Sequence, residues 1–436
     1  MHENKITIVI DFKIYIYLFD PIVKYLIQRN VEVNLVAPSE FKYELEETFS
    51  GLEITYIDYD LIKKRNRLRF IIHRIFKVLL TRSDFSWQFY KKRYELTKKT
   101  HGMQGSLLFL SKFTPKIPNQ HINKVLNFIG GLGLSNPYPT TNIMVGSLNA
   151  SAELLGARDQ NIITVMESWD HAVKEPNGYT SDIFLGWNSS LCEDWKRVQG
   201  DANCLYLHPL KLRYAHEEVK WQPRKSLKTR ILYPAAGTRK FSIEVLVKLE
   251  RQIIDELILA TKELDWELYI KPRPNGSAGE FNYALEHSHV VVGSVSHDSI
   301  SNPADYFYSD KDNQERFSIL NDIDIVVNAF TTFGLDAAAA GLPVLQLDLR
   351  EATGFEESRL VYNNYHIKQY LINQNHVIKP KDKTLSNYLL LNKSELLASA
   401  ERYSQNLKDW LFIYHDSSKA LDDCLGKLID KEWINK

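Results

Sequence analysis

Short apolar runs alternate with stretches of helical spacing along most of the chain. Near the start, Ile6–Asp11 is rich in β-branched residues, Pro21–Arg29 places apolar residues at helical spacing, and Val31–Ala37 is a second apolar run. Further runs of this kind lie at Leu52–Ile57, Asn142–Gly146, Ile162–Met166, Asp182–Trp187 and Asn203–Leu207. Strands that alternate with helices in this way predict a mostly parallel sheet covered by helices.

The same pattern starts again after the polar segment Glu217–Lys228. Ile243–Leu264 predicts a long amphipathic helix, and strands are expected at Thr229–Pro234, Trp266–Lys271, His289–Gly293, Ile323–Asn328 and Leu342–Leu347. We therefore predict an α/β protein with two Rossmann-like domains that face each other across a cleft. The first domain spans residues 1–216, a linker spans 217–228, and the second domain spans 229–400. Helices in 401–436 are expected to pack back on the first domain.

Length and composition agree with this organisation. A chain of 436 residues is long enough for two cores, and its 44% apolar and 25% charged residues are typical of globular proteins. The three cysteines, Cys192, Cys204 and Cys424, match no metal-binding spacing and no disulfide framework, which indicates a reducing compartment. With no long apolar run and no signal-peptide pattern, a cytoplasmic location is expected.

Charge is distributed unevenly, although the formal net charge is zero. Residues 61–100 contain thirteen Lys or Arg against two acids, interleaved with large apolar and aromatic residues. A basic amphipathic segment of this kind predicts contact with an anionic membrane surface, and hence a peripheral position at the inner face of the cytoplasmic membrane. The alternative is an ordinary pair of surface helices. No nucleic-acid-binding module accompanies the charge, so nucleic acid is not an expected partner.

The most informative stretch is Asn328–Gly341. An apolar strand runs into the hydroxyl pair Thr331-Thr332, a helix of small residues follows, and Gly341-Leu342-Pro343 ends it. Backbone amides and the dipole at a helix start attract anions, and threonine hydroxyls can cap the helix or donate to phosphate oxygens. The alternative is a capped helix that binds nothing.

Two other strand ends in the second half carry suitable side chains. Gly237-Thr238-Arg239-Lys240 follows the first strand, and Lys271 and Arg273 end the second. Cations are natural partners of phosphate, and an open α/β sheet binds ligands at the carboxyl ends of its strands. The predicted nucleotide-binding residues are therefore Gly237, Thr238, Arg239, Lys240, Lys271, Arg273, Thr331, Thr332, Phe333 and Asp336.

These motifs resemble the donor-binding segment of GT-B glycosyltransferases and, more distantly, of CDP-glycerol glycerophosphotransferases. Thr331-Thr332 match the hydroxyl pair, Asp336 the acid in the helix, and Gly341-Leu342-Pro343 the ending. Arg273 stands where these families have the histidine of a basic-x-His-Pro motif. The spaced glutamates of one retaining subgroup would fall at Thr331 and Ala339, so both are missing. The resemblance implies a GT-B fold, a nucleotide-activated donor as substrate, and neither a separate cofactor nor a metal.

The candidate catalytic residues lie in the first half. The stretch Ser168-Trp169-Asp170-His171 resembles the Ser-Trp-Asp-Asn motif of bacterial surface-polysaccharide transferases that build capsule and lipopolysaccharide, with His171 in place of Asn. A carboxylate beside the acceptor hydroxyl acts as a general base in an inverting transfer, or as a nucleophile in a retaining one. Asp170 is the first candidate, followed by Glu167 and then His171. The alternative is a set of hydrogen bonds that only fixes the loop.

The expected function is transfer of a sugar from a nucleotide-activated donor to a hydroxyl of a lipid-linked or surface glycan. A CMP-linked acidic sugar such as Kdo suits the extra cations, which would contact the donor's carboxylate. Two alternatives remain open. One is a CDP-polyol glycerophosphotransferase-like enzyme, and the other is a catalytically inactive GT-B partner that binds glycan or membrane.

Overall fold

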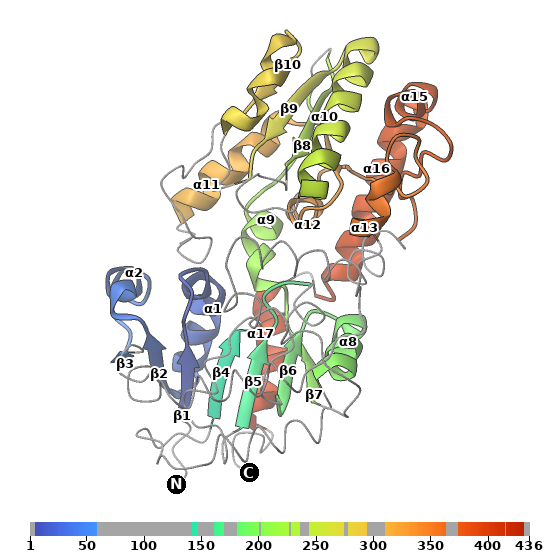
Figure 1. Ribbon diagram of the computed structural model, residues 1–436. Helices are drawn as coiled ribbons and strands as arrows, with labels where there is room; N and C mark the ends of the chain where they lie inside the picture. Colours follow the sequence, from blue (N-terminus) through green and yellow to red (C-terminus); the bar gives the residue numbers. More distant parts are fainter. Residues whose placement is uncertain are drawn as a thin grey trace, which may run out of the picture.

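A computed structural model shows two α/β domains, one above the other in Figure 1. The structure describes residues 5–58, 142–146, 161–169, 181–199, 202–225, 228–235, 244–273, 278–293, 310–362, 374–414 and 416–430. The basic segment 61–100 and the predicted site residues Asp170, His171, Gly237, Thr238, Arg239 and Lys240 lie outside these ranges.

The first domain is built on a seven-stranded sheet of order β3-β2-β1-β4-β5-β6-β7, in which every neighbouring pair is parallel. Ile8 in β1 pairs with Leu35 on one side and Met144 on the other, and all three are buried. Burial on both faces explains why these strands read as continuous apolar runs. The strands are β1 Lys5–Val9, β2 Glu32–Ala37, β3 Ile54–Asp58, β4 Asn142–Gly146, β5 Asn161–Val165, β6 Ile183–Gly186 and β7 Asn203–Tyr206.

Helix α1 (Ile14–Gln28) begins earlier than the helical spacing from Pro21 predicts, and it contains that proline in its interior. An interior proline costs about 3 kcal/mol because it removes one backbone hydrogen bond. The buried side chains of Tyr15, Ile16 and Phe19 offset this, since each contributes roughly 1.5–3 kcal/mol on burial. Before the chain enters the second domain, the other described helices are η1 Ser39–Phe41, α2 Lys42–Thr48, α8 Ser189–Gln199, η4 Leu210–Leu212 and α9 Arg213–Glu217.

The second domain has a five-stranded sheet of order β10-β9-β8-β11-β12, and its pairs are also parallel. Its strands are β8 Arg230–Pro234, β9 Glu267–Lys271, β10 Val290–Val292, β11 Ile325–Asn328 and β12 Val344–Gln346. Its helices are α10 Glu244–Leu264, η5 Ala278–Glu286, α11 Asp310–Ser318, η7 Ile319–Asp322, α12 Phe333–Ala339, η8 Glu356–Ser358, α13 Arg359–Tyr362, α15 Leu385–Leu391 and α16 Lys393–Leu411. Two parallel sheets with flanking helices confirm the predicted α/β architecture of two Rossmann-like domains.

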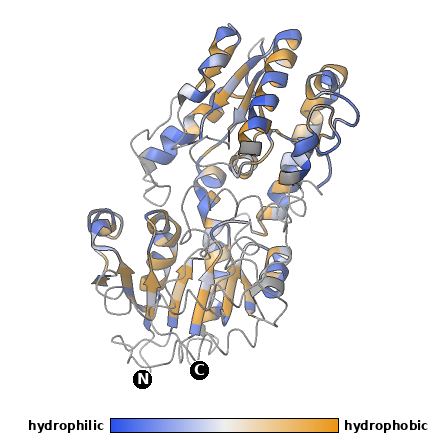
Figure 2. Cartoon of the chain, in the orientation of Figure 1, coloured by the Kyte–Doolittle hydropathy of each residue, from blue (hydrophilic) through white to orange (hydrophobic). Residues whose placement is uncertain are grey.

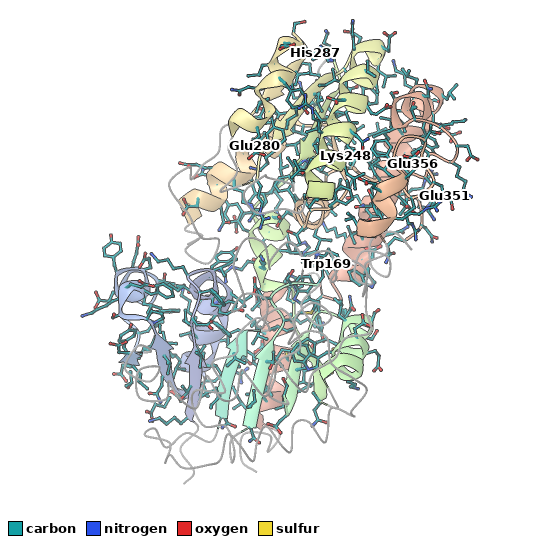
Figure 3. All side chains as sticks on the ribbon, viewed as in Figure 1. Trp169, Lys248, Glu280, His287, Glu351 and Glu356 are labelled. Atoms are coloured by element: carbon teal, nitrogen blue, oxygen red, sulfur yellow. The ribbon has the colours of Figure 1, made fainter. Side chains whose placement is uncertain are left out.

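Apolar residues concentrate on the strands of both sheets, as the colouring in Figure 2 shows. One continuous buried cluster includes Trp169, Phe184 and Trp195 of the first domain together with the core of the second, and Figure 3 places Trp169 near the junction. The two domains therefore share part of their packing. Among the described helices, none combines the length and apolar character needed to cross a bilayer.

The chain crosses between the domains twice. In 217–228, the indole of Trp221 donates to the carbonyl oxygen of Ile323 at 2.9 Å, and Arg224 pairs with Asp324 at 3.2 Å. After α16 the chain returns to the first domain, where α17 (Ser417–Asp430) contacts α1 and β7. Arg29 of α1 pairs there with Asp422 at 2.8 Å.

An aromatic cluster lies where the chain returns. The ring of Phe412 stacks on His216 with centroids 4.0 Å apart and packs against His208 at 4.9 Å. Burial, helped by the nearby His216, lowers the pKa of His208 to about 3, while Asp416 acts in the opposite direction. His208 is therefore neutral in the folded protein near neutral pH.

This pKa predicts acid sensitivity. The folded pKa lies below the ordinary value of 6.5, so the unfolded chain binds a proton that the folded protein does not. Stability should fall as the pH drops below 6.5, by at most roughly 1.4 kcal/mol per pH unit from this group. Urea unfolding at pH 7 and pH 5.5 measures the difference. His208→Phe should reduce the slope, and the same change at the exposed His287 should not; equal slopes in all three proteins would contradict the assignment.

Candidate functional site

Glu167 follows β5 and is held by contacts to both of its carboxylate oxygens. The hydroxyl of Tyr15, from α1, donates to Oε2 at 3.1 Å, and the ammonium of Lys211, from η4, lies 3.1 Å from Oε1. The side chain is buried, so pairing with Lys211 is what makes its charge tolerable there. Among the candidate catalytic residues that the structure describes, Glu167 is thus a fixed carboxylate at the carboxyl edge of the first sheet.

Gly146, at the end of β4, makes room for this arrangement. A Cβ atom at Gly146 would lie 2.4 Å from Cζ of Tyr15, closer than any real contact. Only glycine lets the tyrosine ring lie across the strand end and reach Glu167.

Asp336 is the counterpart in the second domain. It lies in α12, is buried, and accepts a hydrogen bond from Arg316 of α11 at 2.6 Å. Burial raises the pKa of Asp336, while the charges of Arg316, Lys211 and Lys271 oppose the shift. Lys211 belongs to the first domain, so the carboxyl of Asp336 lies within electrostatic reach of cations from both domains. Contacts of α12 with η4 and α9 hold the two halves together at this point.

Lys271 ends β9, and its side chain is mostly buried beside the same cluster. Burial, with a contribution from Arg316, lowers the pKa of Lys271 to about 8, and Asp336 partly restores it. Its Nζ atom lies 5.6 Å from the centroid of the Phe333 ring, a cation–π distance. Phe333 in turn faces Phe317 at 6.5 Å, and Phe317 stacks on Tyr214 of the first domain at 5.6 Å. A row of aromatic rings therefore runs from the first domain to Lys271.

The hydroxyl pair has a structural role that spacing alone did not reveal. Thr331 donates to Oδ1 of Asn328 at 2.7 Å, and the amide of Asn328 donates to Gln346 at 2.7 Å. Gly334 leaves the space for Asn328, because a Cβ there would lie 2.5 Å from its Nδ2 atom. Thr332 is exposed, precedes α12 and makes no side-chain capping bond. In this structure the proton of Thr331 points at Asn328, which leaves only the oxygen lone pairs for a ligand.

The structure gathers Lys271, Phe333 and Asp336 into one cluster and leaves Arg273 exposed two residues beyond β9. No motif in the sequence marks Arg316 or Lys211 as a site residue. Arg316 lies in a largely polar helix, and Lys211 lies in a short 3-10 helix. Each is positioned by a contact with a residue distant in the chain, so the local sequence shows only its positive charge.

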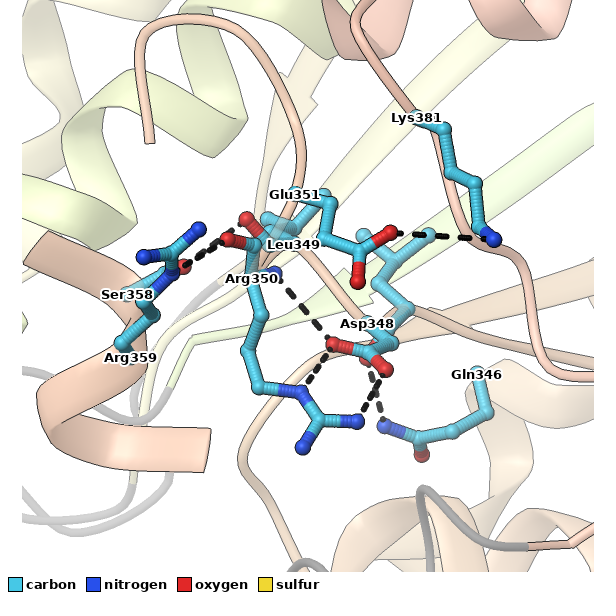
Figure 4. A network of polar contacts seen from close by, with 9 residues as sticks. Gln346, Asp348, Leu349, Arg350, Glu351, Ser358, Arg359 and Lys381 are labelled. Carbon is cyan, nitrogen blue, oxygen red and sulfur yellow. Dashed lines mark hydrogen bonds and ion pairs between the residues drawn. The ribbon is translucent and has the colours of Figure 1, made fainter. Parts of the chain in front are cut away.

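A second charged network closes the loop after β12 (Figure 4). Arg350 binds the buried carboxylate of Asp348 with two donors, Nε at 2.9 Å and a terminal nitrogen at 2.7 Å. Arg359 donates to the backbone oxygen of Arg350 at 3.0 Å. Tyr362, within electrostatic reach of this pair, contacts the ring of Phe330 at 5.0 Å. The network therefore supports the turn that carries Thr331.

Among the residues that the structure describes, no group of three or more His, Cys, Asp or Glu side chains is placed to hold a metal ion. Asp324, of the Asp322-Ile323-Asp324 stretch, instead accepts from Arg224 and from the backbone amide of Arg230 at 2.7 Å. A metal-independent reaction remains a prediction.

No protein-family model and no curated protein matches this chain. Among solved structures it is similar to a protein assigned as a UDP-N-acetylglucosamine 2-epimerase from Listeria monocytogenes, with 13% identity, a TM-score of 0.48, and coverage of 99% of this chain and 98% of that one. It is also similar to the glycotransferase of kitacinnamycin (11% identity, TM-score 0.46, 97% and 98% covered). A third is MurG of Acinetobacter baumannii (11% identity, TM-score 0.42, 97% and 99% covered). At this level of similarity the architecture rests on the strand order and the function on the site itself.

The packing at Gly146 predicts opposite effects of one substitution at two glycines. Gly146→Ala should destabilise the protein by about 1–3 kcal/mol, because the new methyl group overlaps the Tyr15 ring. Gly426→Ala in α17 should stabilise it by roughly 0.5–1 kcal/mol, because the nearest atom is 3.5 Å away and alanine favours helix. Urea unfolding measures both; a neutral Gly146→Ala would show that the Tyr15–Glu167 contact is misplaced.

The charge cluster predicts a shift in the pKa of Lys271. Asp336→Asn removes the carboxyl that partly restores this pKa, so it should fall further below about 8. NMR titration of ¹³C-methylated lysines, with the signal assigned through Lys271→Arg, gives the value directly. Glu357→Gln, which alters only the exposed Lys248 pair, serves as the control and should leave the signal unmoved. A pKa that rises in Asp336→Asn would contradict the arrangement.

Proposed function

We propose that this protein is a glycosyltransferase, which moves a sugar from a nucleotide-activated donor to a hydroxyl of a glycan acceptor. The observation that carries the proposal is the cation cluster around Asp336. Lys271 and Arg316 lie at the carboxyl edge of the second sheet, and Lys211 with Glu167 lies at the carboxyl edge of the first. The resemblance of Thr331-Thr332 and Gly341-Leu342-Pro343 to GT-B donor segments supports the same assignment.

The cations suit the departing nucleotide. As the bond between the sugar and the phosphate breaks, negative charge grows on the phosphate oxygens, and fixed cations in a partly buried site stabilise that charge. Lys271, with a pKa of about 8, is mostly protonated near neutral pH. Its buried ammonium is poorly solvated, so contact with a phosphate would stabilise its charge. Asp336 keeps Arg316 in place, so part of the charge is organised before the donor arrives.

The acceptor half needs a base. The acceptor oxygen attacks the anomeric carbon, the bond to the phosphate oxygen breaks, and the hydroxyl proton passes to a carboxylate. Both oxygens of Glu167 are already engaged by Tyr15 and Lys211, which favours Glu167 as a positioning group. Asp170 is therefore the proposed base, and His171 beside it in the sequence is the proposed partner of that carboxylate.

The proposal extends to the identities of the donor sugar and the acceptor. We propose a CMP-linked acidic sugar such as Kdo, because the positive charges of Lys271, Arg316 and Lys211 gather around Asp336 and suit a donor that carries a carboxylate beside its phosphate. The proposed acceptor is a lipid-linked or surface glycan. The basic segment 61–100 would bring the protein to the anionic inner face of the cytoplasmic membrane, where such acceptors are made.

Nucleotide binding tests the proposal. In calorimetric titrations with CMP, CDP, UDP and GDP, at least one nucleotide should bind, and Lys271→Met or Arg316→Met should weaken it about tenfold or more. Affinity should also fall as the pH rises through about 8, because Lys271 loses its charge. Lys248→Met, which alters an exposed lysine, should bind as the wild type does.

The pattern of binding separates the candidates. CMP alone supports the acidic-sugar donor, and CDP alone together with polyol-phosphate transfer supports the glycerophosphotransferase alternative. Binding without turnover against any donor supports the inactive partner. Asp170→Asn should abolish turnover and leave nucleotide affinity unchanged. If no nucleotide binds, or if both cation variants bind normally, the donor site is wrong.

A further inference from the structure

Two of the three cysteines lie together outside the site described above. Cys192 is in the first turn of α8, and Cys204 is in β7, the edge strand of the seven-stranded sheet. The Sγ atom of Cys192 lies over Gly186 of β6, the strand that pairs with β7. The Sγ atom of Cys204 also lies 3.9 Å from the carbonyl oxygen of Cys192 and 3.7 Å from that of Ala202. The fold therefore pairs two cysteines that their spacing in the sequence left without a role.

The two thiols have different surroundings. Cys192 is buried, and the neighbouring Cys204 thiol together with burial raises its pKa far above the usual range. Cys204 is partly exposed, and the neighbouring Cys192 thiol together with the Lys196 ammonium lowers its pKa, against the effects of burial and Glu193. Lys196 stands one helical turn after Cys192, and the nearby Cys204 raises the pKa of its ammonium. The fold thus places one partly exposed cysteine beside one buried cysteine.

We propose that Cys204 and Cys192 form a site of reversible thiol oxidation, in which Cys204 reacts with a hydroperoxide and Cys192 resolves the product. The Cys204 thiolate attacks the peroxide oxygen, the O–O bond breaks, and a sulfenic acid and an alcohol or water form. Oxidation of Cys204 removes the thiolate charge that holds the proton on Cys192, so the Cys192 thiol loses its proton and attacks the Cys204 sulfur. The S–O bond breaks, and the hydroxyl leaves with that proton as water. Overall, two thiols lose two electrons and two protons, and the peroxide is reduced.

The bond would link the start of α8 to the edge strand. Asn188, just before α8, accepts from the amide of Leu191 at 3.0 Å and donates to the carbonyl oxygen of Trp410 in α16 at 2.8 Å. Oxidation would therefore occur within four residues of a contact between the domains. The proposal does not depend on glycosyl transfer, since it uses none of the residues assigned to that site.

Cys424 provides an internal control. It lies in α17, is buried, and burial raises its pKa to about 12, so little thiolate is available to react. A difference in reactivity between Cys204 and Cys424 in one folded chain separates an activated thiol from general oxidation. The expected difference is about tenfold or more in rate.

Peroxide treatment of the folded, full-length protein tests the site. Thiols titrated after denaturation should fall from three to one, and non-reducing peptide mapping should show a Cys192–Cys204 link that dithiothreitol reverses. Cys424→Ser should form the link unchanged. Cys192→Ser should instead accumulate a sulfenic acid at Cys204, which dimedone labels, and Cys204→Ser should react at least about tenfold more slowly.

Several results would overturn the proposal. They are retention of all three thiols, oxidation of Cys424 at the same rate as Cys204, or links that form only between two chains. The mapping of the wild-type protein needs no substitution, so a variant that fails to fold does not affect the outcome.

Discussion

The buried charge cluster around Asp336 is the constraint on which the rest of this structure depends. A carboxyl in the core is tolerated only when cations and hydrogen bonds replace the lost water. Here the direct partner, Arg316, comes from α11, while Lys271 comes from β9 and Lys211 from the first domain. The same group therefore sets the position of α11, the end of the second sheet and the approach of the first domain. Removing Asp336 would leave the Arg316 guanidinium without its carboxylate partner, so these two residues depend on each other.

Most of the architecture could be predicted because it depends on local pattern. Buried parallel strands are apolar throughout, so Asn142–Gly146 was located to the residue and the other strands and α10 to within about two. The start of α1 was not predictable from Pro21, since burial of Tyr15 and Phe19 overrides the proline. The positions of Arg316 and Lys211 and the Cys192–Cys204 pair were not predictable from the sequence either. Their roles arise from contacts between distant parts of the chain, which no spacing within a segment encodes.

The site divides its tasks between domains. The second sheet presents cations at its carboxyl edge, and the first presents Glu167, held by Tyr15 and Lys211. Lys211 links the two sides, because it pairs with Glu167 and also acts on Asp336. An anionic donor bound near Asp336 would attract the Lys211 ammonium and so weaken its ion pair with Glu167. The two domains are also joined where Phe412 packs on His208 and where α17 contacts α1 and β7.

The most direct test is a crystal structure of the protein with a bound nucleotide. The account predicts phosphate oxygens within hydrogen-bond distance of Nζ of Lys271 and of the Arg316 guanidinium, with Arg316 still in contact with Asp336. It also predicts that the nucleotide lies at the carboxyl edge of the second sheet, beside Phe333. A nucleotide bound elsewhere, with Lys271 and Arg316 in contact only with protein atoms, would contradict it.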